Sequence, residues 1–171
     1  MKGLAYPKTT WTYQERPVAS AKLNTWDDRI EAALDLAFML LSMAWGGANG
    51  VVPGVTANNL KVVPLGIPGL AVVVEPGCAF IARAPFRLVA AHQTPAVTPP
   101  TSQPRIDLVQ ARLATWDVGV KTGVEAAAPT APSADADCLA LARLYLRPGM
   151  QAIWAADDGI NGYIVDVRSF L

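Results

Sequence analysis

Apolar residues recur at helical spacing between residues 25 and 46. Thr25 is a suitable N-cap, with Asp28 three residues later, and acidic residues at 27 and 28 suit the positive end of a helix. Gly46 and Gly47 follow the last apolar residue and are expected to stop the helix. The i, i+3, i+4, i+7 pattern is carried by Ile30, Ala33, Leu34, Ala37, Phe38, Leu41, Ala44 and Trp45. It predicts one long helix, which we place within residues 23–50.

The opposite side of this helix is also apolar. Its polar residues form only a thin stripe, made of Asp28, Glu31, Asp35 and Ser42. A helix that is apolar nearly all round must be buried on more than one side. Either the second side contacts another subunit, or the helix lies at the centre of the domain and is wrapped by its own sheet. The candidate interface residues on this second side are Leu36, Met39, Leu40 and Met43.

The pattern changes to short strands from residue 51 onward. Pro-Gly pairs that begin at residues 53, 68, 76 and 148 are typical of turns. Regularly spaced short strands between such turns indicate an antiparallel β-sandwich or barrel-like domain across residues 51–171. The clearest β-branched or aromatic runs span residues 60–63, 70–74, 78–83 and 86–91. The expected fold class is α+β, with an N-terminal arm and one long apolar helix ahead of the β-rich domain.

Three segments lack a helix or strand period. Residues 1–22 scatter Trp11 and Tyr13 among Thr, Lys and Pro, and we expect an extended arm that docks through these aromatic side chains. Residues 93–104 and 125–137 are rich in Pro and have too little apolar content to pack. We expect both to be exposed loops, partly in the polyproline II conformation.

The composition favours a protein that is buried within an assembly. At 171 residues the chain suits one domain with an appended arm. The hydrophobic fraction of 52% is high and the charged fraction of 16% is low, so apolar atoms must cover much of the surface. The 14 basic and 14 acidic residues cancel, which argues against nucleic acid or anionic lipid as a partner. The longest apolar stretch, residues 36–45, is too short to span a bilayer.

The sequence contains no pattern typical of a catalytic or metal site. His92 is the single histidine, and no Cys/His cluster has the spacing of a zinc site. No nucleophile–histidine–acid signature, phosphate-binding loop or dinucleotide fingerprint is present. Residues 157–162, Asp-Asp-Gly-Ile-Asn-Gly, fit a hairpin turn better than a calcium loop. We therefore expect no enzyme activity, no cofactor and no metal ion.

Cysteine usage is sparse. Cys78 and Cys138 are the only two cysteines, so one disulfide is possible and a stapled scaffold is not implied. Free cysteine is among the most buried residue types, and two buried thiols are the favoured interpretation.

Two short motifs place opposite charges two residues apart. Arg105 and Asp107 share one face of a strand, and Asp166 and Arg168 do the same in a second strand. If the two strands are neighbours, Asp107 would pair with Arg168 and Arg105 with Asp166. This crossed set of charges would fix the register or line a subunit contact. The alternative is four solvated surface charges, which contribute little as ion pairs.

The order and spacing of several motifs resemble a module of tailed-bacteriophage virion proteins, found in tail fibres and baseplates. The similarity covers most of residues 23–168. In chain order the motifs are Leu-Asn-Thr-Trp-Asp-Asp-Arg-Ile at 23–30, Val-Val-Val-Glu-Pro-Gly-Cys-Ala-Phe-Ile at 72–81, Pro-Arg-Ile-Asp-Leu-Val at 104–109, a Gly with an Ala/Pro loop at 123–132, Leu-Ala-Leu-Ala with a later Pro-Gly at 139–149, and Ile-Val-Asp-Val-Arg at 164–168.

The resemblance implies a non-enzymatic structural protein of the phage particle, made in the host cytoplasm. Many such chains continue into a fibre shaft or receptor-binding head, whereas this one ends three residues after Arg168. We therefore expect a tail, baseplate or spike-base adaptor that anchors fibres or spikes. By analogy with fibres it would be a homotrimer that contacts other virion proteins. The alternative is a receptor- or glycan-binding tip or a capsid decoration protein, which would use the Pro-rich loops and exposed Trp side chains.

Overall fold

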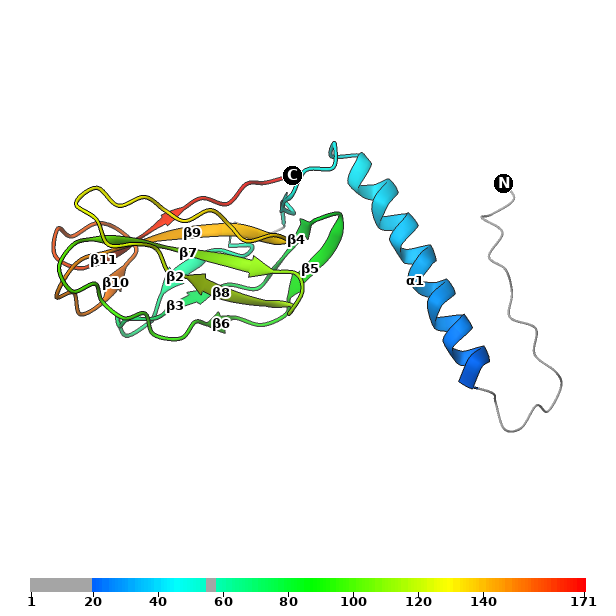
Figure 1. Ribbon diagram of the computed structural model, residues 1–171, viewed down its shortest axis with the longest axis horizontal. Helices are drawn as coiled ribbons and strands as arrows, with labels where there is room; N and C mark the ends of the chain where they lie inside the picture. The colour runs from blue at the N-terminus through cyan, green and yellow to red at the C-terminus, as the bar shows by residue number, and fades with distance from the viewer. Residues whose placement is uncertain (1–19, 55–57) are drawn as a thin grey trace. The chain divides into compact units, whose positions relative to one another are not determined.

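The computed structural model describes residues 20–54 and 58–171 (Figure 1). The chain divides into two compact units, Met1–Gly46 and Gly47–Leu171. The described part of the first unit is a single helix, and the second unit consists of β-strands and loops. The α+β fold class with a β-rich domain is therefore confirmed.

The helix α1 (Ser20–Met43) begins earlier than predicted. Thr25 is not its N-cap, because it lies inside the helix and its hydroxyl donates to the Ala21 carbonyl oxygen at 2.8 Å. Residues 20–22, assigned to the arm, are also helical, and the rest of the arm, with Trp11 and Tyr13, lies outside the described residues.

The predicted stop of the helix is confirmed. The turn after α1 ends at Gly46 and Gly47, whose φ angles are 66° and 72°. These left-handed angles carry a steric penalty for residues with a Cβ and almost none for glycine, so the pair can turn the chain away from the helix.

The β unit contains three open sheets among the described residues, with strand orders β1-β4-β5, β2-β3-β6 and β10-β11-β9-β7-β8. All pairs are antiparallel except β10 with β11. The four strand runs predicted between residues 60 and 91 match β2 to β5 to within a few residues. The strands are β1 Gly50–Val51, β2 Val62–Pro64, β3 Val72–Val74, β4 Gly77–Ile81, β5 Ala84–Leu88, β6 His92–Gln93, β7 Arg105–Arg112, β8 Asp117–Lys121, β9 Cys138–Leu146, β10 Ile153–Trp154 and β11 Gly162–Asp166.

The pairing of β7 with β9 is the longest in the unit, and it contains one irregularity. Gln110 pairs with Ala140 while Val109 pairs with Ala142, so Leu141 is an extra residue on β9. This bulge shifts the two-residue alternation of β9. Buried side chains therefore fall at 139 and 141 before the bulge, and at 142, 144 and 146 from it onward. A leucine-rich strand thereby fills the core along its whole length.

One hydrophobic core holds the β unit together. It draws buried side chains from all three sheets, including Val72 of β3, Phe86 of β5 and Leu144 of β9. No residue of α1 contributes to this core. The interpretation of α1 as a central helix wrapped by its own sheet is therefore wrong, because the sheets already satisfy one another's apolar faces.

The β unit is also closed by its own ends. The Val51 amide donates to the Ser169 carbonyl oxygen at 2.8 Å, and the Leu171 amide donates to the Val51 carbonyl oxygen at 3.1 Å. Val51 and Phe170 form a parallel bridge. The last residues of the chain thus lie beside the first strand of the unit.

The loop at 93–104 is not simply exposed, as the sequence predicted. Thr94, Val97 and Pro100 are buried. The Thr94 amide donates to Val72 at 2.9 Å and the Val97 amide donates to Leu70 at 2.8 Å. The segment runs beside β3 as an irregular extension of its sheet, which low apolar content alone did not reveal.

Gly123 shows how tightly a second loop is seated. A Cβ added to Gly123 would lie 2.0 Å from the Ile106 carbonyl oxygen, whereas one added to Gly66 meets nothing within 4 Å. Neither residue has a positive φ. Contact with backbone leaves little room for relaxation.

We predict that Gly123→Ala lowers the free energy of unfolding by about 3 kcal/mol because the loop must move off β7. Gly66→Ala is the matched control, with a change within about 0.5 kcal/mol. Urea denaturation followed by fluorescence measures both. Equal effects of the two substitutions would show that the loop is not held against β7.

Candidate functional site

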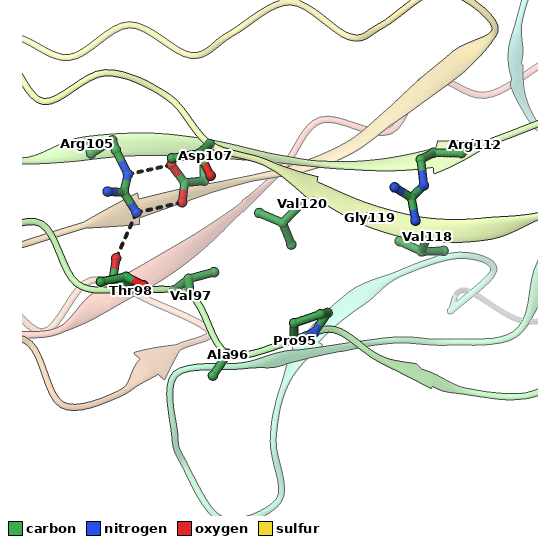
Figure 2. Close-up of a pocket in the computed structure, with 11 residues that line it drawn as sticks. Pro95, Ala96, Val97, Thr98, Arg105, Asp107, Arg112, Val118, Gly119 and Val120 are labelled. Carbon is green, nitrogen blue, oxygen red and sulfur yellow. Dashed lines mark hydrogen bonds and ion pairs between the residues drawn. The ribbon is translucent and has the colours of Figure 1, made fainter. Parts of the chain in front are cut away.

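A groove lies beside the edge of the five-stranded sheet (Figure 2). Its volume is about 360 Å³. We call it the edge groove. It is lined by residues 95–98, by Arg105, Asp107 and Arg112 of β7, by residues 118–120 of β8, and by Thr122.

One wall of the edge groove is a sheet strand, and the other is an irregular segment. One wall is β8, which is the last strand of its sheet and pairs only with β7. The other wall is the 95–98 segment, whose Val97 amide donates to the carbonyl oxygen of Leu70, two residues before β3. Val118 and Val120 project from β8 on the side that faces this segment (Figure 2). The groove therefore separates two extended backbones.

A buried ion pair lies at one end of the groove. Arg105 Nε donates to Asp107 Oδ1 at 2.7 Å, and Nη2 donates to Oδ2 at 3.0 Å. The side chains of Arg105 and Asp107 are 11% and 1% exposed. Arg105 Nη2 also donates to the Thr98 carbonyl oxygen at 2.8 Å, and the Gly123 amide donates to Asp107 at 2.9 Å. The pair thus joins β7 to the loop before it, as Figure 2 shows, and to the loop after β8.

A second ion pair lies at the other end, where the β7–β8 hairpin closes. Arg112 Nε and Nη2 donate to the two Asp117 carboxylate oxygens at 2.7 and 2.6 Å. These hydrogen bonds lower the pKa of Asp117, although burial opposes the shift. Both guanidinium groups that line the groove are therefore neutralised by a carboxylate.

The crossed charge pairing predicted from the sequence is wrong. Strand β9 lies between β7 and β11, so the two motifs are not on neighbouring strands. Arg105 pairs with Asp107 and Arg168 pairs with Asp166, each within its own motif. The alternative of four solvated charges is also wrong for Arg105, Asp107 and Arg168, and only Asp166 is largely exposed.

Arg168 secures the end of β11. Its Nη2 donates to Asp166 at 2.6 Å, and its Nη1 donates to the Asn59 carbonyl oxygen at 2.6 Å. The Arg168 hydrogen bond is the largest cause of the lowered pKa of Asp166. The guanidinium also lies 5.2 Å from the centroid of the Phe170 ring. One side chain thus fixes the chain just before its final residues meet β1.

Glu125 ties the two Pro-rich loops together. Its carboxylate accepts backbone hydrogen bonds from Thr101 at 2.9 Å, Ser102 at 3.2 Å and Gln103 at 3.4 Å. These bonds, led by those from Thr101 and Ser102, lower the pKa of Glu125 to about 2. Local sequence patterns do not reveal this role, because the partners are more than twenty residues apart.

Asp135 performs a similar task on the second loop. It accepts hydrogen bonds from Lys121 of β8 and Gln110 of β7, and its own amide donates to Gln110 at 3.0 Å. The bond from Lys121 is the largest cause of the lowered pKa of Asp135. Residues 125–137 are therefore held across the face of the sheet opposite the core.

Residues 157–162 are a closed turn, but not a hairpin turn. The strands that they connect, β10 and β11, are parallel. Asp158 accepts hydrogen bonds from the amides of Ile160 and Asn161, and Asp157 is bound by Arg147 at 2.8 Å. Within the described part of the chain, no three His, Cys, Asp or Glu residues are placed to hold a metal ion.

The remaining reactive side chains are scattered. Cys78 and Cys138 are both free thiols and half-buried, and burial raises the pKa of Cys138. His92 lies on β6, where it pairs with Val74 of β3. Neither cysteine nor the histidine lines the edge groove. The groove therefore offers backbone edges, apolar side chains and neutralised ion pairs for recognition.

The candidate interface residues on α1 remain uncovered by the described residues of the chain. Met39, Leu40 and Met43 are 39%, 54% and 66% exposed, and Leu36 is half-buried. Trp11 and Tyr13 lie outside the described residues.

No family model matches the chain, and neither the curated proteins nor the solved structures include a significant match.

We predict that Asp107→Ala lowers the free energy of unfolding by about 3–5 kcal/mol, because it leaves the Arg105 guanidinium buried without its partner. Asp117→Ala is the control, since the side chains of its ion pair with Arg112 are 35% and 42% exposed, and should cost about 1 kcal/mol or less. The combined replacement Arg105→Met with Asp107→Leu should recover part of the loss, because no charge stays buried but the Thr98 carbonyl and the Gly123 amide lose their partners. Chemical denaturation measures all three. An equal cost for Asp107→Ala and Asp117→Ala would contradict the assignment.

We predict that the amide resonances of residues 101–103 titrate with a midpoint near pH 2, the pKa of Glu125. The pKa is depressed from 4.5, so the contacts are fully present above that value and are lost as the pH falls through 2. Glu125→Gln should abolish this titration without moving the amides of β9. NMR spectra between pH 5 and 1.5 provide the measurement, and a midpoint near 4.5 would show that the carboxylate does not hold the loop.

Proposed function

We propose that this protein is a non-enzymatic structural component of a phage particle, in which α1 assembles copies of the chain and the β unit serves as a rigid attachment module. It would act as a tail, baseplate or spike-base adaptor that anchors fibres or spikes. The observation that carries the proposal is the exposure of large apolar side chains along the whole of α1.

The apolar surface of α1 is too extensive for a helix that remains in water. Single exposed apolar residues are normal on protein surfaces, whereas a continuous patch marks an interaction site. An isolated helix is also marginal in water, and packing of its apolar surface supplies most of its stability. The large apolar residues of α1 that are at least 39% exposed are Leu23, Trp26, Ile30, Leu34, Met39, Leu40, Leu41 and Met43.

The spacing of apolar residues supports another copy of α1 as the partner. One seam alternates steps of three and four residues, which is the heptad pattern of coiled coils. The acidic stripe of Asp28, Glu31 and Asp35 lies on the other side of the helix, where it would stay in water. The seam consists of Leu23, Trp26, Ile30, Ala33, Ala37 and Leu40.

The β unit supports a role as a stiff module. Its Pro-rich loops are fastened by Glu125 and Asp135, and its last residues are bonded to β1. Segments held by several hydrogen bonds and buried contacts open less readily than free loops. An adaptor that transmits position between neighbours needs this stiffness.

The resemblance of residues 23–168 to tail-fibre and baseplate modules supplies the proposed setting. It favours a homotrimer and other virion proteins as neighbours. Among the described residues, no helix is long and apolar enough to cross a membrane.

We predict that the wild-type chain has a solution mass three times the 18.1 kDa of one chain, and that Ile30→Glu combined with Leu40→Glu reduces it to that of one chain. Burying two carboxylates in the interface would cost several kcal/mol. Asn24→Glu, which adds a charge beside the acidic stripe, is the control and should remain a trimer. Light scattering after size-exclusion chromatography measures the mass. A wild-type monomer at micromolar concentration would contradict the proposal.

A further inference from the structure

The outer edge of β8 is paired with no other strand among the described residues, and Val118 on it is 2% exposed. β8 pairs with β7 on one side, and no described residue forms a backbone hydrogen bond to its other side. An edge strand presents a row of backbone donors and acceptors that can pair with another extended segment. The residues of β8 next to the groove, Val118, Gly119 and Val120, carry no charge that would repel such a segment.

The edge groove sets the chemistry of that segment. Its centre is apolar, with Val97 on one wall and Val118 and Val120 on the other. The charges at its two ends are already paired, Arg105 with Asp107 and Arg112 with Asp117. A charged occupant would find no free partner, whereas an uncharged extended segment with large apolar side chains on alternate residues would fill the space.

Residues 9–13, Thr-Thr-Trp-Thr-Tyr, have this chemistry. They lie in the part of the chain that the structure does not describe. All five are β-branched or aromatic, the types that favour strands, and none is charged. In an extended conformation Trp11 and Tyr13 share one side, and residues 10 and 12 share the other. The segment has five residues, as β8 does.

We propose that residues 9–13 of a second copy of this chain pair with the outer edge of β8 and insert Trp11 and Tyr13 into the edge groove. The added strand would lie between β8 and the 95–98 segment. It would thereby link the five-stranded sheet to the sheet that contains β3. This proposal adds a specific contact between copies to the proposed function. It rests on the proposed function only because a second copy must be present.

Chain length favours a second copy over the same chain. The seven residues from Tyr13 to Ser20 span at most about 25 Å. The 24 residues of α1 extend about 36 Å. Tyr13 therefore cannot reach the Met43 end of its own helix. A segment from another copy carries no such restriction.

A peptide-binding experiment tests the assignment. The receptor is the full chain with Trp11→Ala and Tyr13→Ala, which removes its own insert, and the probe is a fluorescent peptide of residues 7–15. We expect saturable binding in fluorescence anisotropy. A peptide with the residues at 11 and 12 exchanged has the same composition but places the indole on the opposite side, and should bind at least ten-fold more weakly. Equal binding of the two peptides, or none up to millimolar concentration, would overturn the proposal.

Variants of the receptor locate the binding. Ala96→Arg fills the groove from its exposed wall and should weaken peptide binding at least ten-fold. Ala156→Arg makes the same change at an exposed alanine outside the groove and should leave it unchanged. Circular dichroism confirms that both variants fold. Equal peptide affinity of the two variants would place the peptide elsewhere and overturn the proposal.

A mixed-label experiment identifies the source of the segment. Unlabelled chains that carry p-benzoylphenylalanine in place of Thr12 are refolded with nitrogen-15 chains and irradiated. Cross-links from unlabelled to labelled chains at residues 95–98 or 118–120 would support a second copy, and cross-links only within a chain would overturn it. Light scattering on the same samples keeps the outcomes separate. Loss of cross-links from intact oligomers rejects only the groove assignment, whereas a monomeric wild type rejects the proposed function.

Discussion

The ion pair between Arg105 and Asp107 is the junction on which the order of the β unit depends. Its two hydrogen bonds lie at the start of β7, which is paired on both sides. The same two side chains also bind the loop before β7, through Thr98, and the loop after β8, through Gly123. Two buried charges are costly unless their remaining donors and acceptors are satisfied. Here the extra hydrogen bonds to Thr98 and Gly123 satisfy the buried charges and also hold the two loops in place. The same bonds therefore stabilise the ion pair and shape the edge groove.

Carboxylates elsewhere in the β unit work in the same way at the surface. Glu125 gathers three consecutive backbone amides, Asp135 joins a loop to β7 and β8, and Asp158 closes the turn before β11. Their pKa values are lowered mainly by hydrogen bonds. In a chain with few charges, these acidic side chains take the place of the apolar contacts that Pro-rich loops lack.

Local patterns were enough to predict the fold class, the long helix and its glycine stop, and the short strands from residue 60 to 91. They were not enough for features that depend on partners distant in the sequence. The predicted crossed charge pairing was wrong because neither short motif contains information on strand order, and β9 separates β7 from β11. The predicted start of the helix was wrong because a threonine hydroxyl can cap a helix or donate to a carbonyl oxygen in the preceding turn, as Thr25 does. The edge groove brings residues 95–98 beside residues 118–120, and no spacing rule connects these segments.

The bridge between Val51 and Phe170 has a mechanical meaning. The first strand of the β unit and its last residues run parallel to each other, joined by two backbone hydrogen bonds. When force is applied to the two ends of a unit closed in this way, the pulling directions oppose each other along the strands. The two hydrogen bonds are then loaded together in shear, and they do not break one after the other. Tension applied between the two ends of the β unit is thus carried by these two hydrogen bonds before it reaches the core.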